Sequence, residues 1–70
     1  MTKKKLKKQI GGSHYKYMAI QPIEYINANH LKFAEGCVVK YVSRHQNKNG
    51  KEDILKAIQN LEFILQRDYD

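Results

Sequence analysis

The stretch KEDILKAIQNLEFILQR, residues 51–67, decides the fold. Its apolar residues recur at intervals of three and four positions, which is the spacing of one face of an α-helix. Glu52 and Asp53 in the first turn and Arg67 in the last turn suit the helix dipole. Phe63 falls on the opposite side and is a candidate oligomer contact. We predict a helix over about 51–67 with an apolar stripe of Ile54, Ala57, Ile58, Leu61, Ile64 and Leu65.

Two shorter helices are predicted before this one. Pro22 suits the first turn of a helix, because its missing N–H would have no partner there. That helix is expected to end in the poor helix-forming segment 27–30. The next helix is predicted over about 31–45, and its core-facing residues are Ala34, Cys37, Val38, Tyr41 and Val42. The fold class is therefore all-α, a small three-helix domain with an extended, partly disordered basic N-terminal segment.

The length of the chain points to self-association. Seventy residues make one small domain, which we assign to 13–70. A chain of this size buries only about 60% of the surface that it exposes when unfolded, so its own core is marginal. Cys37 is the only cysteine, which excludes an internal disulfide. Idealised helix packing or oligomerisation must reinforce such a core, and we expect a homo-oligomer.

The net charge of +6 is concentrated at the N-terminus. Without the five lysines of residues 3–8, eight of the 13 Lys and Arg remain against seven Asp and Glu. Residues 1–12 are predicted to form a basic tail with a glycine joint, Gly11-Gly12, giving weak, non-specific attraction to nucleic acid. No apolar run approaches a membrane span, and no signal peptide follows the lysines, so we expect a cytoplasmic protein that makes no membrane contact.

The helix over 31–45 carries the first candidate site. Gly36, Lys40 and Arg44 are spaced by four and therefore share one face. The glycine costs about 1 kcal/mol relative to Ala, so a close helix or a ligand is expected to use the missing side chain. Lys40 and Arg44 form a cationic pair with no acidic partner on that face, and an anion between them would relieve their repulsion. The alternative is a solvated basic face.

The turn Lys48-Asn49-Gly50 is the second candidate site. A glycine-containing turn that leads into a helix N-terminus offers free N–H groups to an anion. It is not a P-loop, because Glu52 follows Lys51 where Ser or Thr is required. An ordinary connecting turn explains the same residues.

Three further groups of residues are weaker candidates for a site. Asp53 and Lys56 are spaced to couple a carboxylate to a phosphate-neutralising cation, although a surface ion pair is the ordinary interpretation. His14 and Tyr15 are placed to contact a base or a phosphate; the alternative is that Tyr15 and Tyr17 cover the small core. The histidines and Cys37 lack a recognised metal-ligand spacing, so no metal site is predicted.

Several short motifs occur together in a characteristic order. They are His14-Tyr15, residues 20–26 (IQPIEYI), Phe33 with Gly36, residues 40–44 (KYVSR), Lys48-Asn49-Gly50, Glu52-Asp53 and Lys56-Ala57. Over residues 13 to about 65 the chain resembles a family of small phage proteins catalogued as a domain of unknown function. One member type is a phage nucleotide kinase without a P-loop, which phosphorylates deoxynucleoside monophosphates.

The resemblance implies a nucleotide site in a phage protein of the infected host cell. The matches to its recurring polar positions are His14, Tyr15, Lys40, Arg44, Lys48, Asp53 and Lys56. For a nucleoside monophosphate kinase, Lys40 and Arg44 would clamp phosphate between subunits, and the amides after Gly50 would bind a further oxygen. Asp53 would be the catalytic residue that holds Mg²⁺ with the nucleotide.

Two other functions remain open from the sequence. The first is a non-catalytic nucleotide sponge with no cofactor, which sequesters a host immune signalling nucleotide as an anti-defence protein. A chain of 70 residues can fulfil this function more easily, because binding requires neither a metal ligand nor the in-line geometry of phosphoryl transfer. The second is a small nucleic-acid-binding accessory protein that relies on the lysine tail.

Overall fold

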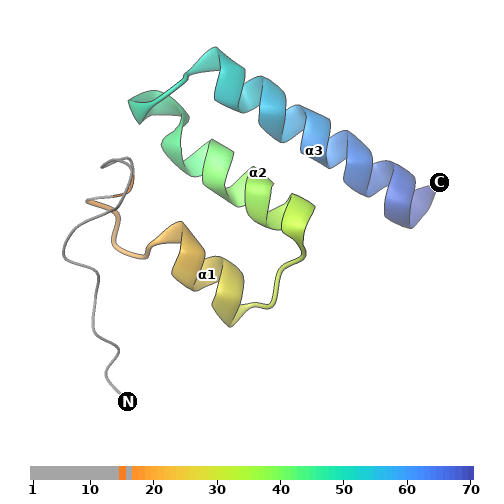
Figure 1. Cartoon of the computed structure of the whole chain (residues 1–70), viewed down its shortest axis with the longest axis horizontal. Helices are drawn as coiled ribbons and strands as arrows, with labels where there is room; N and C mark the ends of the chain where they lie inside the picture. Colours follow the sequence, from red (N-terminus) through yellow and green to blue (C-terminus); the bar gives the residue numbers. More distant parts are fainter. Residues whose placement is uncertain (1–14, 16) are drawn as a thin grey trace.

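The computed structural model describes residues 15 and 17–70, and these residues form three α-helices and no strand. The elements are α1 (Pro22–Ala28), α2 (Phe33–Arg44), the short 3-10 helix η1 (His45–Asn47) and α3 (Lys51–Tyr69) (Figure 1). The predicted all-α class and the three helices are confirmed. The predicted basic tail and glycine joint lie outside the described residues, as does His14.

Local sequence signals set both ends of α1. Pro22 occupies the first turn as predicted, and the Gln21 amide before it donates to the Glu24 carboxylate at 3.1 Å. At the other end His30 has a positive φ of 54°, the left-handed conformation that usually selects glycine. The Leu31 amide then donates to the Ile26 carbonyl at 3.0 Å, which ends the helix in a Schellman motif.

The turn between α2 and α3 makes the two helices an antiparallel hairpin. The Gly50 amide donates to the His45 carbonyl at 2.8 Å, and Gly50 has a φ of 52°. Glycine adopts this left-handed backbone without the penalty that a Cβ would add. The chain therefore reverses in a few residues, and the C-terminal end of α2 lies beside the N-terminal end of α3 (Figure 1).

The helices form a single layer with α2 in the middle, α1 on one side and α3 on the other (Figure 1). Gly36 is buried where α1 approaches α2, and a Cβ there would lie 3.2 Å from Cγ2 of Ile26. The glycine in the middle of α2 is thus used by a close helix, one of the two explanations that the sequence offered.

A layer one helix thick leaves little core. Among the described residues the buried apolar side chains are Pro22, Ala34 and Ala57. The sequence predicted Val42, Ile58, Leu61 and Leu65 to face the core, but they are 50%, 45%, 47% and 57% exposed, respectively. That expectation is wrong for the single chain, because α3 packs against α2 alone and no second layer covers its apolar stripe.

Within the described residues, no helix combines the length and the apolar character needed to cross a bilayer.

Candidate functional site

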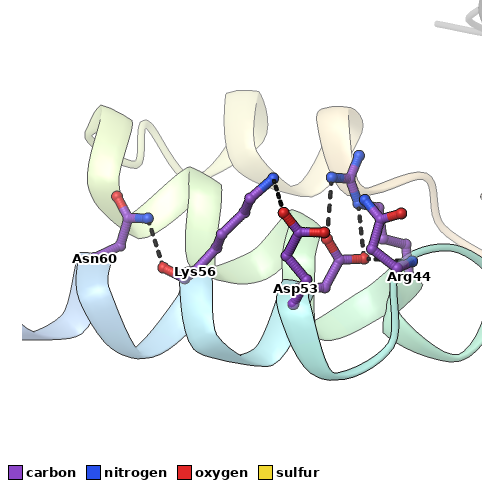
Figure 2. Close-up of polar contacts among 6 residues, drawn as sticks. Arg44, Asp53, Lys56 and Asn60 are labelled. Carbon is purple, nitrogen blue, oxygen red and sulfur yellow. Dashed lines mark hydrogen bonds and ion pairs between the residues drawn. The ribbon is translucent and has the colours of Figure 1, made fainter.

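An arginine and an aspartate join the two arms of the hairpin at its closed end. Nε and Nη2 of Arg44, in the last turn of α2, donate to Oδ2 and Oδ1 of Asp53, each at 3.2 Å (Figure 2). The Asn49 amide also donates to Asp53 Oδ2, at 3.3 Å. The Asp53 side chain is completely buried and that of Arg44 is 13% exposed. The acidic partner of Arg44 therefore comes from α3 and not from its own face of α2.

The ion pair shifts the pKa of both partners. Burial raises the pKa of Asp53, but hydrogen bonds from Arg44 and from the Asn49 amide outweigh it, and the pKa lies below its ordinary value. Burial lowers the pKa of Arg44, whereas its interactions with Asp53 and Tyr15 raise it, and the net shift is upward. Both groups are therefore charged across the physiological pH range.

Tyr15 reaches this pair from the segment before α1. Its carbonyl accepts hydrogen bonds from the Gln21 side chain at 2.8 Å and from the Met18 amide at 3.1 Å. Its hydroxyl is buried, and its side chain contributes to the raised pKa of Arg44. The structure thus brings two predicted site residues, Tyr15 and Arg44, together.

The ring of Tyr41 contacts two cations. The Arg44 guanidinium carbon is 5.0 Å from the centroid of its ring, and Lys56 Nζ is 5.7 Å from the same centroid. Both distances are typical of cation–π contacts. Lys56 also reaches Glu52 Oε2 at 3.8 Å, and its backbone carbonyl accepts from the Asn60 side chain at 2.8 Å (Figure 2). The pairing of Asp53 with Lys56 that the sequence allowed is therefore replaced by Arg44–Asp53 and Lys56–Glu52.

The remaining predicted residues lie on α2 and in the turn before α3. Lys40 is exposed and lies one turn before Arg44 on the same face of α2. Lys48 is exposed in the turn, and Gly50 is the N-cap of α3. Of the amides that follow Gly50, that of Glu52 already donates to the Asn49 carbonyl at 3.1 Å. We call Lys40, Tyr41, Arg44, Asp53 and Lys56 the hairpin cation cluster.

The open end of the hairpin has a second arginine–carboxylate group, which sequence analysis missed. The Arg67 guanidinium donates to Glu35 of α2 and to its neighbour Asp68. Hydrogen bonds from Arg67 lower the pKa of both carboxylates. Glu35 and Arg67 are 32 residues apart, so only the antiparallel pairing of α2 with α3 could have indicated their contact.

No three His, Cys, Asp or Glu side chains of the described chain gather where they could hold a metal ion. Cys37 is a free, half-buried thiol. The assigned roles of the site residues, Asp53 as a catalytic group among them, stay predictions.

By its fold and its candidate site, this chain is a small all-α protein with a cluster of cations on a helical hairpin. Within this class the chain belongs to the protein family of unknown function DUF3310, whose profile matches residues 4–62. The resemblance to a family of unknown function is thereby confirmed, while the link to a phage nucleotide kinase stays a prediction. No curated protein and no solved structure shows significant similarity to the chain.

Proposed function

We propose that the protein binds the phosphate groups of a nucleotide at the hairpin cation cluster and holds the nucleotide without reacting with it. The observation that carries the proposal is the arrangement of Arg44 and Lys56 over one Tyr41 ring, with Lys40 a turn away. Three cations there meet two carboxylates, Asp53 and Glu52. The cluster therefore keeps an excess of positive charge.

Arg44 is the anchor of this site. Two of its five N–H donors are held by Asp53, and that contact fixes the plane of the guanidinium. A guanidinium fixed in this way loses little conformational entropy when its other edge meets a phosphate. Lys40 is an exposed ammonium group on a flexible stem and supplies a second, adaptable contact.

The environment of Asp53 favours binding over phosphoryl transfer. Its side chain is completely buried, and both of its oxygens accept hydrogen bonds within the chain. A carboxylate that binds Mg²⁺ must present an oxygen to the metal and its water ligands, and the completely buried Asp53 side chain presents none to solvent. We therefore assign Asp53 to positioning Arg44. The resemblance to phage proteins suggests the role, which is sequestration of a signalling nucleotide in the infected cell.

Native mass spectrometry with a panel of nucleoside mono-, di- and triphosphates and cyclic dinucleotides, each with and without Mg²⁺, tests the proposal. We expect a nucleotide to bind and to be recovered unchanged. Conversion of a deoxynucleoside monophosphate in the presence of ATP would instead establish the kinase. Salt-sensitive affinity for DNA that disappears when residues 1–12 are deleted, without nucleotide binding, would establish the accessory nucleic-acid protein.

Single substitutions locate the site. Lys40→Ala should weaken nucleotide binding about tenfold, because a hydrogen bond to a charged group contributes about 1.5 kcal/mol or more. Lys32→Ala is the matched control, since Lys32 is an exposed lysine at the other end of α2. Equal loss of affinity in both variants would mean that the ligand responds to overall charge, and the proposed site would be wrong.

A further inference from the structure

The exposed apolar stripe on α3 has the spacing of a helix-pairing seam. Ile54, Ile58, Leu61 and Leu65 are separated by four, three and four residues, which is the pattern of a coiled-coil contact. Ile58, Leu61 and Leu65 are 45%, 47% and 57% exposed. An apolar stripe left uncovered in a chain with so little core marks an interaction surface.

This seam lies on a different side of α3 from the cation cluster. At 100° per residue, its residues point about a quarter-turn away from Asp53 and Ala57, the buried residues that face α2. Lys56 lies on roughly the opposite side of the helix from the seam. Val42 of α2, 50% exposed, falls on the seam side of the hairpin.

The seam residues of α3 are arranged symmetrically about the middle of the helix, so two antiparallel copies of α3 complement each other. About the midpoint between Gln59 and Asn60, each apolar residue of the seam mirrors another. Ile54 mirrors Leu65, and Ile58 mirrors Leu61. Two antiparallel copies of α3 in this register would therefore place apolar side chains opposite apolar side chains along the whole seam.

The charges that flank the seam follow the same symmetry. Lys51 and Asp68 lie about 50° to either side of the seam and mirror each other, so a base meets an acid at each end of the pair. Lys51 is exposed at one end of α3, and the Asp68 side chain is 32% exposed at the other. A parallel pair would instead place like charges side by side, which costs free energy.

We propose that two copies of this chain pair through α3, antiparallel, around a two-fold axis that passes between Gln59 and Asn60. A second copy is the occupant that fits, because a two-fold contact requires one surface to complement itself. The two α2–α3 hairpins then form a four-helix arrangement whose core is the seam. The hairpin cation clusters remain on the outer sides, so each chain keeps its own cluster.

Phe63 provides a matched control for this surface. It is 53% exposed, close to the 47% of Leu61 only two residues away, but it lies off the seam beneath Arg67. Sedimentation equilibrium should give a dimer for the unmodified chain and for Phe63→Glu. Leu61→Glu should weaken dimerisation at least a hundredfold, or leave an unfolded monomer. Dissociation by Phe63→Glu, with Leu61→Glu still dimeric, would overturn the proposal.

A charge exchange tests the register with variants that leave the seam untouched. Lys51→Glu and Asp68→Lys should each weaken the dimer severalfold, because each places like charges opposite one another. The double variant Lys51→Glu/Asp68→Lys should restore the affinity of the unmodified chain. If the double variant loses as much dimer affinity as the two single variants together, the antiparallel register is refuted. If the unmodified chain is a monomer, the pairing itself is refuted. Neither readout depends on nucleotide, so these failures are distinct from failure of the proposed ligand.

Discussion

Replacing Arg44 by Met tests the contact that joins α2 to α3. The substitution keeps a long apolar stem but removes the guanidinium, and it leaves the completely buried Asp53 carboxylate with the Asn49 amide. Removal of one partner of a buried ion pair costs about 3–5 kcal/mol, since an uncompensated charge remains. The 13% exposure of Arg44 favours the lower end, about 3 kcal/mol. A chain of 70 residues has a total stability of about 4–10 kcal/mol, so this loss is a large fraction.

Two further variants separate the ion pair from general effects of charge. Arg44→Met/Asp53→Leu replaces both partners by apolar groups and should recover most of the lost stability. Glu52→Gln breaks the exposed contact with Lys56 and should change the free energy of unfolding by less than about 1 kcal/mol. Urea unfolding followed by far-ultraviolet circular dichroism, at one fixed protein concentration, measures all three.

Either of two results would show that the Arg44–Asp53 ion pair does not stabilise the hairpin in this way. Arg44→Met could reduce the free energy of unfolding by less than about 1 kcal/mol, which would make the pair equivalent to a surface contact. Alternatively, the double variant could be no more stable than Arg44→Met, which would mean that the buried carboxylate is not the source of the loss.

Three other predictions concern the backbone and the titration of the fold. His30→Gly should raise the free energy of unfolding by about 1 kcal/mol, because glycine relieves the left-handed strain at φ 54°; urea unfolding measures it, and unchanged stability would contradict it. The lowered pKa of Asp53 contributes stability that is present above its ordinary value of 3.8 and is lost as pH falls through the lowered value, so thermal stability should decline only below about pH 4. A decline that begins near pH 6 would point to another group. Gly36→Ala should raise the free energy of unfolding of the Ile26→Ala variant by about 1 kcal/mol. In the unmodified chain the same substitution should raise it by less, because Ile26 Cγ2 would lie 3.2 Å from the new Cβ. A double-mutant cycle measures the difference, and a coupling below about 0.3 kcal/mol would exclude the crowding.

Local signals in the sequence predicted the helices well. Pro22 starts α1 and Gly50 precedes α3, because both residues have backbone properties that act over a few neighbours. The predicted third helix, about 51–67, differs from the observed Lys51–Tyr69 only at its C-terminal end. Periodicity located an apolar stripe on α3, but Ala57 is its only buried member, and the others are half-buried or exposed. It could not show that Ile58 stays half exposed, since a pattern indicates which face is apolar and not what covers it.

The sequence predicted the residues of the candidate site but not the ion pair between Arg44 and Asp53. Lys40 and Arg44 were placed on one face of α2, where they lie. The acidic partner of Arg44 came from the next helix, nine residues further along the chain, and helical spacing within one element cannot indicate such a contact. A signal did exist: an arginine in the last turn of one helix and an aspartate in the first turn of the next, joined by a short turn. In an antiparallel hairpin those two positions adjoin.

The near absence of a buried interior has a consequence for how this chain behaves at low concentration. The buried apolar side chains of the described chain are Pro22, Ala34 and Ala57, so in the proposed dimer much of the free energy that holds the helices together would come from association. Dilution of such a dimer favours unfolding, and its melting temperature rises with protein concentration. Its susceptibility to a protease would then fall as its concentration rises.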